Sequence, residues 1–119
     1  MKYLMLFYKG HGPRREPGTP EFLELLNAYN EADSAMRRAG VLVECAPLEP
    51  TTSSTTVRVR GGETLLTDGP AAEIKEQVGG FALVECADLD EAIRWAATIP
   101  AARDASVEIR PLVNVEVPT

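Results

Sequence analysis

The chain has 119 residues, of which 45% are hydrophobic and 25% charged, and its formal net charge is −6. This length suits one domain with one core, and the composition is that of a folded globular protein. The acidic balance argues against nucleic-acid or membrane partners, because both attract basic surfaces. No apolar run reaches the roughly 18 residues that a membrane-spanning helix needs. We therefore expect a single cytoplasmic domain over residues 1–119.

Residues 2–9 predict a first strand that is apolar on both faces. Its side chains alternate between the two faces: one face carries Tyr3, Met5 and Phe7, and the other carries Leu4, Leu6 and Tyr8. Such a strand must be covered on both sides. A loop over residues 10–19 follows, with Thr19 as N-cap and Pro20 as first residue of a helix. Gly40 predicts the end of this helix. Its apolar stripe is expected to face the core: Phe22, Leu25, Leu26, Tyr29, Ala32 and Met36.

Residues 41–48 alternate as a second strand, with Val41, Val43 and Cys45 on one face. Residues 55–60 and 63–67 flank Gly61-Gly62, which predicts a tight β-hairpin. We expect a short helical turn over residues 71–77. Gly79-Gly80 then opens a strand that runs to Ala87.

Asp88 predicts the N-cap of a second helix, with Glu91 in a capping-box relation to it. The expected apolar stripe of this helix is Leu89, Ala92, Ile93, Ala96 and Ala97. Pro100 is expected to end it. A last strand is predicted over residues 106–117, where Val107, Ile109, Val113, Val115 and Val117 alternate with polar residues.

The predicted order is two strand–helix–strand halves with a hairpin between them, which is an α+β domain. Two helices cover only one face of a sheet. The second face remains apolar, as the first strand indicates, and little chain is left to make another layer. We therefore expect a two-fold homodimer with facing sheets, burying about 1,200–2,000 Å² in total.

The two cysteines, Cys45 and Cys86, each lie within an apolar strand pattern and are expected to be small buried thiols. They lack the spacing of a zinc motif, and His11 is the only histidine. Phosphate-binding, dinucleotide-binding and serine-hydrolase motifs are also absent from the sequence. We expect neither a metal nor a cofactor.

The stretch from Asp68 to Phe81 reads Asp-Gly-Pro-Ala-Ala-Glu-Ile-Lys-Glu-Gln-Val-Gly-Gly-Phe. It resembles the DGPF family of YCII-related proteins. The opening residues 1–6, the hairpin residues 57–59 and the ending 107–111 resemble it too. This resemblance implies a ferredoxin-like domain, ordered βαβ–hairpin–βαβ, that forms a dimeric α/β barrel.

Ala71, Ile74 and Ala82 depart from the residues usual in this family, so a pocket walled by the family's aromatic rings should be roomier here. Some YCII-type relatives suggest a histidine–aspartate pair, with the histidine near the start of the first helix. Residues 20–23 contain no histidine, so that pair is not transferred to this chain.

Asp68 has two interpretations. An aspartate before Gly-Pro often forms a turn by accepting from downstream backbone amides, or it is a base or ligand contact at the rim of the cleft. Glu73 and Lys75 follow it, either as solvated charges worth well under ~1 kcal/mol as an exposed pair, or as ligand contacts. His11 is either an exposed loop residue or a general acid/base.

Arg58 and Arg110 are predicted on strand faces opposite apolar residues. They form either cross-strand charge pairs or an anion site in the cleft, because the planar guanidinium holds a carboxylate or phosphate in two-point contact. Tyr8 and Phe81 complete the ligand-binding candidates. Gly79-Gly80 permits close approach of a ligand to the backbone, or marks a bulge.

Two functions of different classes follow. One is a small-molecule-binding or regulatory dimer. The resemblance to accessory proteins of sigma-factor regulation implies a protein partner for it. The alternative is a cofactor-free lyase or isomerase for a cyclic or aromatic compound, which rests on fold analogy.

Overall fold

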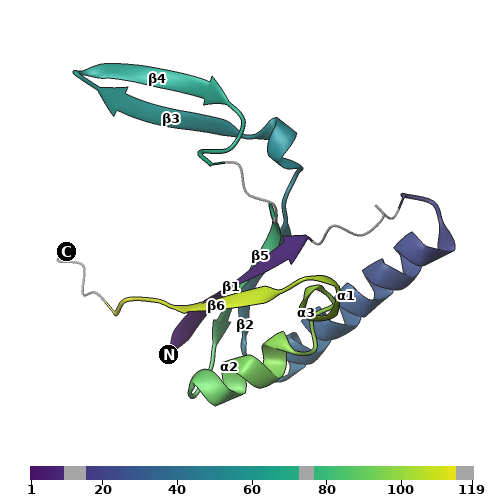
Figure 1. Cartoon of the computed structure of the whole chain (residues 1–119). Coiled ribbons are helices and arrows are strands. Elements are labelled where there is room, and N and C mark those ends of the chain that lie inside the picture. The colour runs from purple at the N-terminus through teal and green to yellow at the C-terminus, as the bar shows by residue number, and fades with distance from the viewer. Residues whose placement is uncertain (10–15, 73–76, 115–119) are drawn as a thin grey trace.

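The computed structural model describes residues 1–9, 16–72 and 77–114. Four strands form an antiparallel sheet in the order β2-β5-β1-β6 (Figure 1). Their bounds are β1 (Lys2–Lys9), β2 (Leu42–Pro47), β5 (Gln77–Glu85) and β6 (Val107–Pro111). The strands β3 (Thr55–Arg60) and β4 (Glu63–Asp68) form a separate hairpin that stands clear of this sheet. The helices are α1 (Pro20–Arg38), α2 (Leu89–Ala96) and α3 (Ala101–Asp104), with a 3₁₀ turn, η1 (Thr51–Ser53), before the hairpin.

This architecture confirms the predicted α+β class and the hairpin between two strand–helix–strand halves. The end of α1 is also as expected: Gly40 follows its C-cap with φ +74°, a conformation that glycine adopts at little cost. The Thr19 hydroxyl accepts a hydrogen bond from the Phe22 amide at 3.2 Å, with Pro20 in the first turn. At the hairpin, Gly61 and Gly62 have φ of +56° and +81°, which suits a tight two-residue turn.

The cap of α2 differs from the expected box in one bond. The Asp88 carboxylate accepts from the Glu91 amide at 2.9 Å, as predicted. The Glu91 carboxylate accepts from the Ala87 amide at 2.9 Å, one residue before the amide that a capping box uses. These two bonds pair the amides of Ala87 and Glu91 at this end of the helix.

The hydrophobic core lies between one face of the sheet and the helices. Its buried side chains are Tyr3, Met5 and Phe7 of β1, Ala82 and Val84 of β5, Ala32 and Met36 of α1, Ala92 and Ala96 of α2, Ala101 of α3, and Val41, Cys86 and Ile99 from the connections. All three helices therefore pack on the face that Tyr3, Met5 and Phe7 occupy. Burial of these apolar side chains is the main favourable contribution to folding.

Five side chains that the sequence predicted on apolar faces are exposed: Leu26, Val43, Leu89, Ile93 and Ala97. Val43 is exposed because the register of β2 shifts between Leu42 and Glu44, and such a bulge breaks the simple alternation of a strand. Leu89 and Ile93 are also about half exposed. The small Ala92 and Ala96 face the core instead, with Trp95 packed beside them.

Other differences concern element ends. The helix α2 ends at Ala96, before Pro100, and Pro100 is instead the N-cap of the short helix α3. The last strand stops at Pro111, and Val113 is exposed; Val115 and Val117 lie outside the described residues. Gly79 and Gly80 lie within β5, which begins at Gln77, so the helical turn expected over residues 71–77 does not include residue 77. Residues 73–76 of that prediction lie outside the described residues.

Candidate functional site

The sheet face opposite the helices carries apolar side chains that the described residues leave only partly covered. They are Leu4, Leu6 and Tyr8 of β1, Ala46 of β2, and Phe81 and Leu83 of β5. We call this set, with the charged residues that flank it, the open face. The predicted two-sidedness of the first strand is thus confirmed: its other three apolar residues are buried under the helices.

Strand register places the side chains of the open face in rows. Leu6 lies opposite Phe81 on one side and opposite Glu108 on the other. In the next row, Leu4 lies between Leu83 and Arg110. The face therefore has an apolar centre, with a carboxylate and a guanidinium along its β6 edge.

Tyr8, Glu108 and Arg110 form a hydrogen-bonded group at this edge. The Tyr8 hydroxyl donates to Glu108 Oε1 at 3.1 Å. Arg110 Nε donates to Glu108 Oε2 and pairs with it as an ion pair. The Arg110 and Tyr8 hydrogen bonds lower the pKa of Glu108 below its ordinary value of 4.5, because both stabilise the ionised carboxylate.

The guanidinium of this group is available to a ligand. The Arg110 side chain is 69% exposed. Its two terminal nitrogens have no hydrogen bond with any part of the chain that the structure describes, since only Nε contacts Glu108. Glu108 holds the Arg110 side chain at the edge of the apolar rows, and the two terminal NH2 groups of the guanidinium take no part in this bond.

The structure brings some of the sequence candidates together and separates others. Tyr8, Phe81 and Arg110 share the open face. Arg58 and Asp68 lie on the hairpin, which pairs with no strand of the sheet. His11, Glu73 and Lys75 lie outside the described residues.

On the hairpin, neither residue takes the expected partner. Arg58 Nη2 donates to the backbone oxygen of Ala71 at 3.5 Å, instead of pairing with a carboxylate. The turn after β4 is closed by other groups: the Gly69 amide donates to Ser54 O, and the Thr56 hydroxyl donates to Gly69 O, each at 2.7 Å. The Asp68 carboxylate makes no hydrogen bond among the described residues, so its expected turn-forming bonds are not observed there.

Sequence reasoning did not single out Glu108 as a site residue. The signal was present, since Val107 and Ile109 alternate with Glu108 and Arg110 and so place both charges on one face. The partner Tyr8, however, is about 100 residues away in sequence and is found only through strand pairing. Ala82 requires a correction: its side chain is fully buried on the helix side, so its small size does not widen a pocket on the open face.

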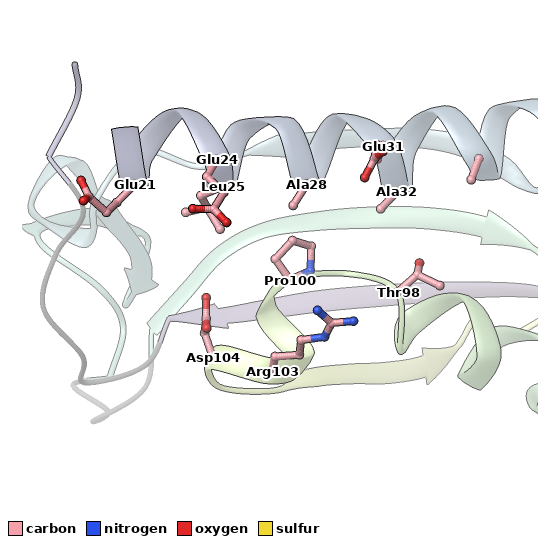
Figure 2. A pocket seen from close by; sticks show the side chains of 11 residues that line it. Glu21, Glu24, Leu25, Ala28, Glu31, Ala32, Thr98, Pro100, Arg103 and Asp104 are labelled. Carbon is pink, nitrogen blue, oxygen red and sulfur yellow. The ribbon is translucent and has the colours of Figure 1, made fainter. Parts of the chain in front are cut away.

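A groove lies on the helix side of the sheet, between α1 and the segment around α3 (Figure 2). Its volume is about 490 Å³. Four carboxylates line it, those of Glu21, Glu24, Glu31 and Asp104, together with the cation Arg103. Its apolar lining includes Leu25, Ala28, Ala32 and Pro100. Within the described ranges, no three His, Cys, Asp or Glu residues are grouped so that they could hold a metal. Nothing had been assigned to this groove, and it offers an acidic surface without a convergent set of donors and acceptors.

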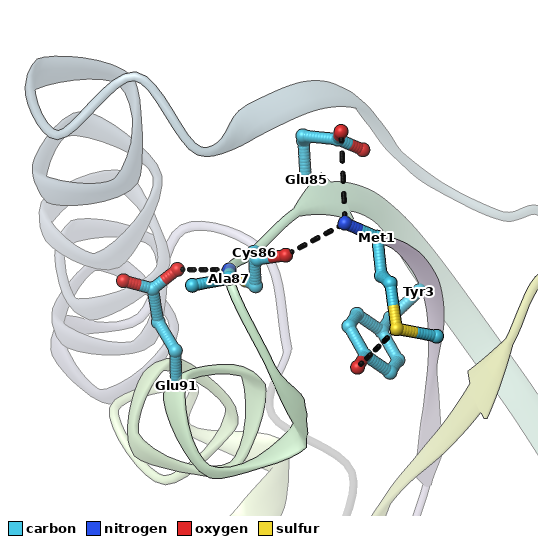
Figure 3. Close-up of polar contacts among 6 residues, drawn as sticks. All are labelled: Met1, Tyr3, Glu85, Cys86, Ala87 and Glu91. Carbon is cyan, nitrogen blue, oxygen red and sulfur yellow. Dashed lines mark hydrogen bonds and ion pairs between the residues drawn. The ribbon is translucent and has the colours of Figure 1, made fainter.

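The cysteines have structural surroundings. Cys86 is buried, and its carbonyl oxygen accepts a hydrogen bond from the Met1 amino group at 2.9 Å. The same amino group lies 3.7 Å from the Glu85 carboxylate (Figure 3). Cys45 is only half-buried, against expectation; its thiol lies 3.7 Å from Asp33 Oδ2. Desolvation raises the pKa of both thiols, which disfavours the nucleophilic thiolate.

No helix that the structure describes is both long and apolar enough to span a bilayer. The YCII-related domain model matches residues 1–116. An uncharacterised protein of Rhizobium meliloti (strain 1021) is 49% identical over 114 residues, which cover 94% of this chain and 92% of that protein. The chain belongs to the YCII-related domain family, as its central motif indicated.

Proposed function

We propose that the chain is one subunit of a two-fold homodimer that binds small aromatic carboxylic acids between its facing sheets, as a sensing or accessory protein. The subunit corresponds to a ferredoxin-like domain, and the pair to a dimeric α/β barrel. The observation that carries the proposal is the open face, where an exposed guanidinium stands beside apolar rows that are only partly covered.

The dimer is supported by the arrangement of layers. All three helices lie on one side of the sheet, and a contiguous apolar patch on the other side is typical of an interaction surface. A second copy supplies a matching face without any further partner, since a two-fold interface uses the same patch on both subunits. The buried area expected for such an interface is about 1,200–2,000 Å².

The ligand class follows from the chemistry of the face. Arg110 presents two terminal NH2 groups, one N–H of each of which suits one oxygen of a carboxylate. Phe81, Leu6 and Leu83 offer an apolar floor that suits an aromatic ring. A compact anion without an apolar body would leave this floor wet, so an aromatic acid suits the face better than inorganic phosphate.

Binding is favoured over catalysis by the state of Glu108. A general base works best when its pKa lies near the operating pH. The pKa of Glu108 is lowered, and both its oxygens already accept hydrogen bonds. The enzymatic alternative, a cofactor-free lyase or isomerase, would need another base on this face. A regulatory role would add a protein partner that binds the ligand-bound dimer in preference to the ligand-free one.

Thermal-shift measurements with benzoate and its neutral analogue benzamide test the ligand. We expect saturating benzoate to raise the melting temperature, because a ligand at 100 times its Kd stabilises by about 2.7 kcal/mol, and benzamide to do so much less. Arg110→Ala should abolish the benzoate effect, and Arg94→Ala, which removes an exposed arginine of α2, should keep it. Equal melting-temperature shifts with benzoate and benzamide would refute the carboxylate site. An undiminished benzoate shift in Arg110→Ala would refute it too.

Sedimentation velocity at micromolar concentration tests the assembly. A dimer is expected. A monomer at this concentration would reject the facing-sheet arrangement, and with it any cleft between subunits.

A further inference from the structure

The β3–β4 hairpin has two chemically different faces. Register puts Val57 opposite Leu66, Val59 opposite Thr64 and Thr55 opposite Asp68, so one face carries three apolar side chains, Val57, Val59 and Leu66, with Thr64 toward the turn and Thr55 and Asp68 at the base. The opposite face carries Arg58, Arg60, Glu63, Leu65 and two threonines, Thr56 and Thr67. Val57, Val59 and Leu66 are 58%, 59% and 69% exposed, which makes the first face a continuous apolar strip without cover.

This hairpin also extends away from the rest of the subunit (Figure 1). It has its own two-stranded sheet and pairs with none of the other four strands. The radius of gyration is 16.7 Å, whereas a compact chain of this length has one of about 13.5 Å. An isolated two-stranded hairpin is marginally stable in water. Its regular pairing and its exposed apolar strip together require a surface to pack on.

The same chain carries a complementary surface, the open face of the four-stranded sheet. Each subunit has one apolar strip and one open face, so two copies can satisfy both reciprocally. We propose that the hairpin is an exchange arm: Val57, Val59 and Leu66 pack on the part of a second copy's open face that the facing sheets leave uncovered, and close that copy's cleft. Each ligand cleft is then incomplete without the partner's arm.

This inference deepens the proposed function and rests on its homodimer. It adds that the arm is the element that excludes water from a bound aromatic acid, since displacing water from the ring's surface needs apolar atoms on both of its faces. The strip supplies those atoms with valine and leucine side chains. The charged face of the arm, with Arg58 and Glu63, then remains toward solvent.

Paired substitutions on the two hairpin faces test the arm. Leu66→Asp puts a charge into the strip, whereas Leu65→Asp puts the same charge on the adjacent position of the opposite face. Sedimentation equilibrium should show the dimer Kd raised about ten-fold or more by Leu66→Asp, because a buried unpaired charge is costly. Leu65→Asp should stay within about three-fold of the wild type. Equal effects, or no effect of Leu66→Asp, would overturn the exchange arm.

Hydrogen–deuterium exchange on the unmodified chain gives a second measurement that needs no variant. Amides of β3 and β4 should be protected at concentrations above the dimer Kd and should lose protection on dilution below it. The amides of β1, paired on both sides within the subunit, should remain protected at both concentrations. Hairpin protection that does not change with dilution would refute the proposal.

Benzoate thermal shifts separate the arm from the binding function. If Leu66→Asp loses the benzoate response and Leu65→Asp keeps it, the arm closes the cleft. If the dimer dissociates in Leu66→Asp but the wild type never responded to benzoate, the arm stands and the ligand proposal fails. If Leu66→Asp stays dimeric and still responds, the arm is refuted and the binding proposal survives.

Discussion

The glycine pair of β5 offers a direct test of how the sheet is packed. A Cβ added at Gly80 would lie 3.1 Å from the Ala46 carbonyl oxygen, 3.3 Å from Phe7 Cδ2 and 3.5 Å from Pro47 Cα. Two of these atoms belong to the backbone of β2, and a backbone cannot turn aside as a side chain does. In addition, Leu48 N donates to Gly79 O at 2.9 Å, which holds the two strands together at this point.

Gly80→Ala should therefore destabilise the protein. Over-packing of this kind costs about 1–3 kcal/mol, and the reduced entropy of the unfolded chain returns about 0.4–1 kcal/mol. The expected net loss is about 0.5–2 kcal/mol. At about 4 °C per kcal/mol for a chain of this size, the melting temperature should fall by roughly 2–8 °C.

Gly79→Ala is the matched control. There the added Cβ would meet only side-chain atoms of Lys9, Cε at 2.5 Å and Cγ at 2.8 Å among them. Lys9 is exposed and can rotate away, so this variant should lie within about 0.5 kcal/mol of the wild type. Urea unfolding followed by the fluorescence of Trp95, the single tryptophan, measures both at one fixed protein concentration. If Gly80→Ala is as stable as the wild type, or if Gly79→Ala is less stable than Gly80→Ala, the packing argument is wrong.

Three further predictions concern stability, the first two measured by the same urea unfolding and the third by thermal unfolding. Met36 is fully buried, so Met36→Ala should cost about 2–5 kcal/mol, and a loss under about 1 kcal/mol would contradict its place in the core. Asp88→Ala removes the N-cap bond of α2 and should cost about 0.5–2 kcal/mol; Asp88→Asn, which can still accept the bond, should recover most of it. Because Arg110 and Tyr8 lower the pKa of Glu108 below 4.5, the ionised carboxylate stabilises the fold above that pH, and this contribution is lost as pH falls through the lowered pKa. The melting-temperature difference between wild type and Glu108→Gln should thus be constant above about pH 5 and shrink below it; a difference that grows in acid would show that the sign is wrong.

The local parts of the fold were predictable because they depend on residues close in sequence. Thr19 caps α1 through an amide three residues away, and Asp88 does the same for α2. Gly61-Gly62 determines the hairpin turn by its backbone conformation. The alternation of β1 predicted two apolar faces, because side chains of a strand point to opposite sides at every step.

Other features were decided by which strands become neighbours. The bulge at Val43 appears only when β2 pairs with β5. The face that α2 presents also depends on its partner: Ala92 and Ala96 let the helix approach the sheet closely, while Leu89 and Ile93 remain outside.

The candidate site divides in the same way. The sequence by itself determined that the first strand has a second apolar face, and it named Tyr8, Phe81 and Arg110 as candidates for ligand binding. Only the tertiary structure decided that they share one surface, that Glu108 joins them, and that Arg58 and Asp68 do not. The physical reason is that alternation and capping act over a few residues, whereas a site requires side chains distant in sequence, which backbone pairing between strands brings together.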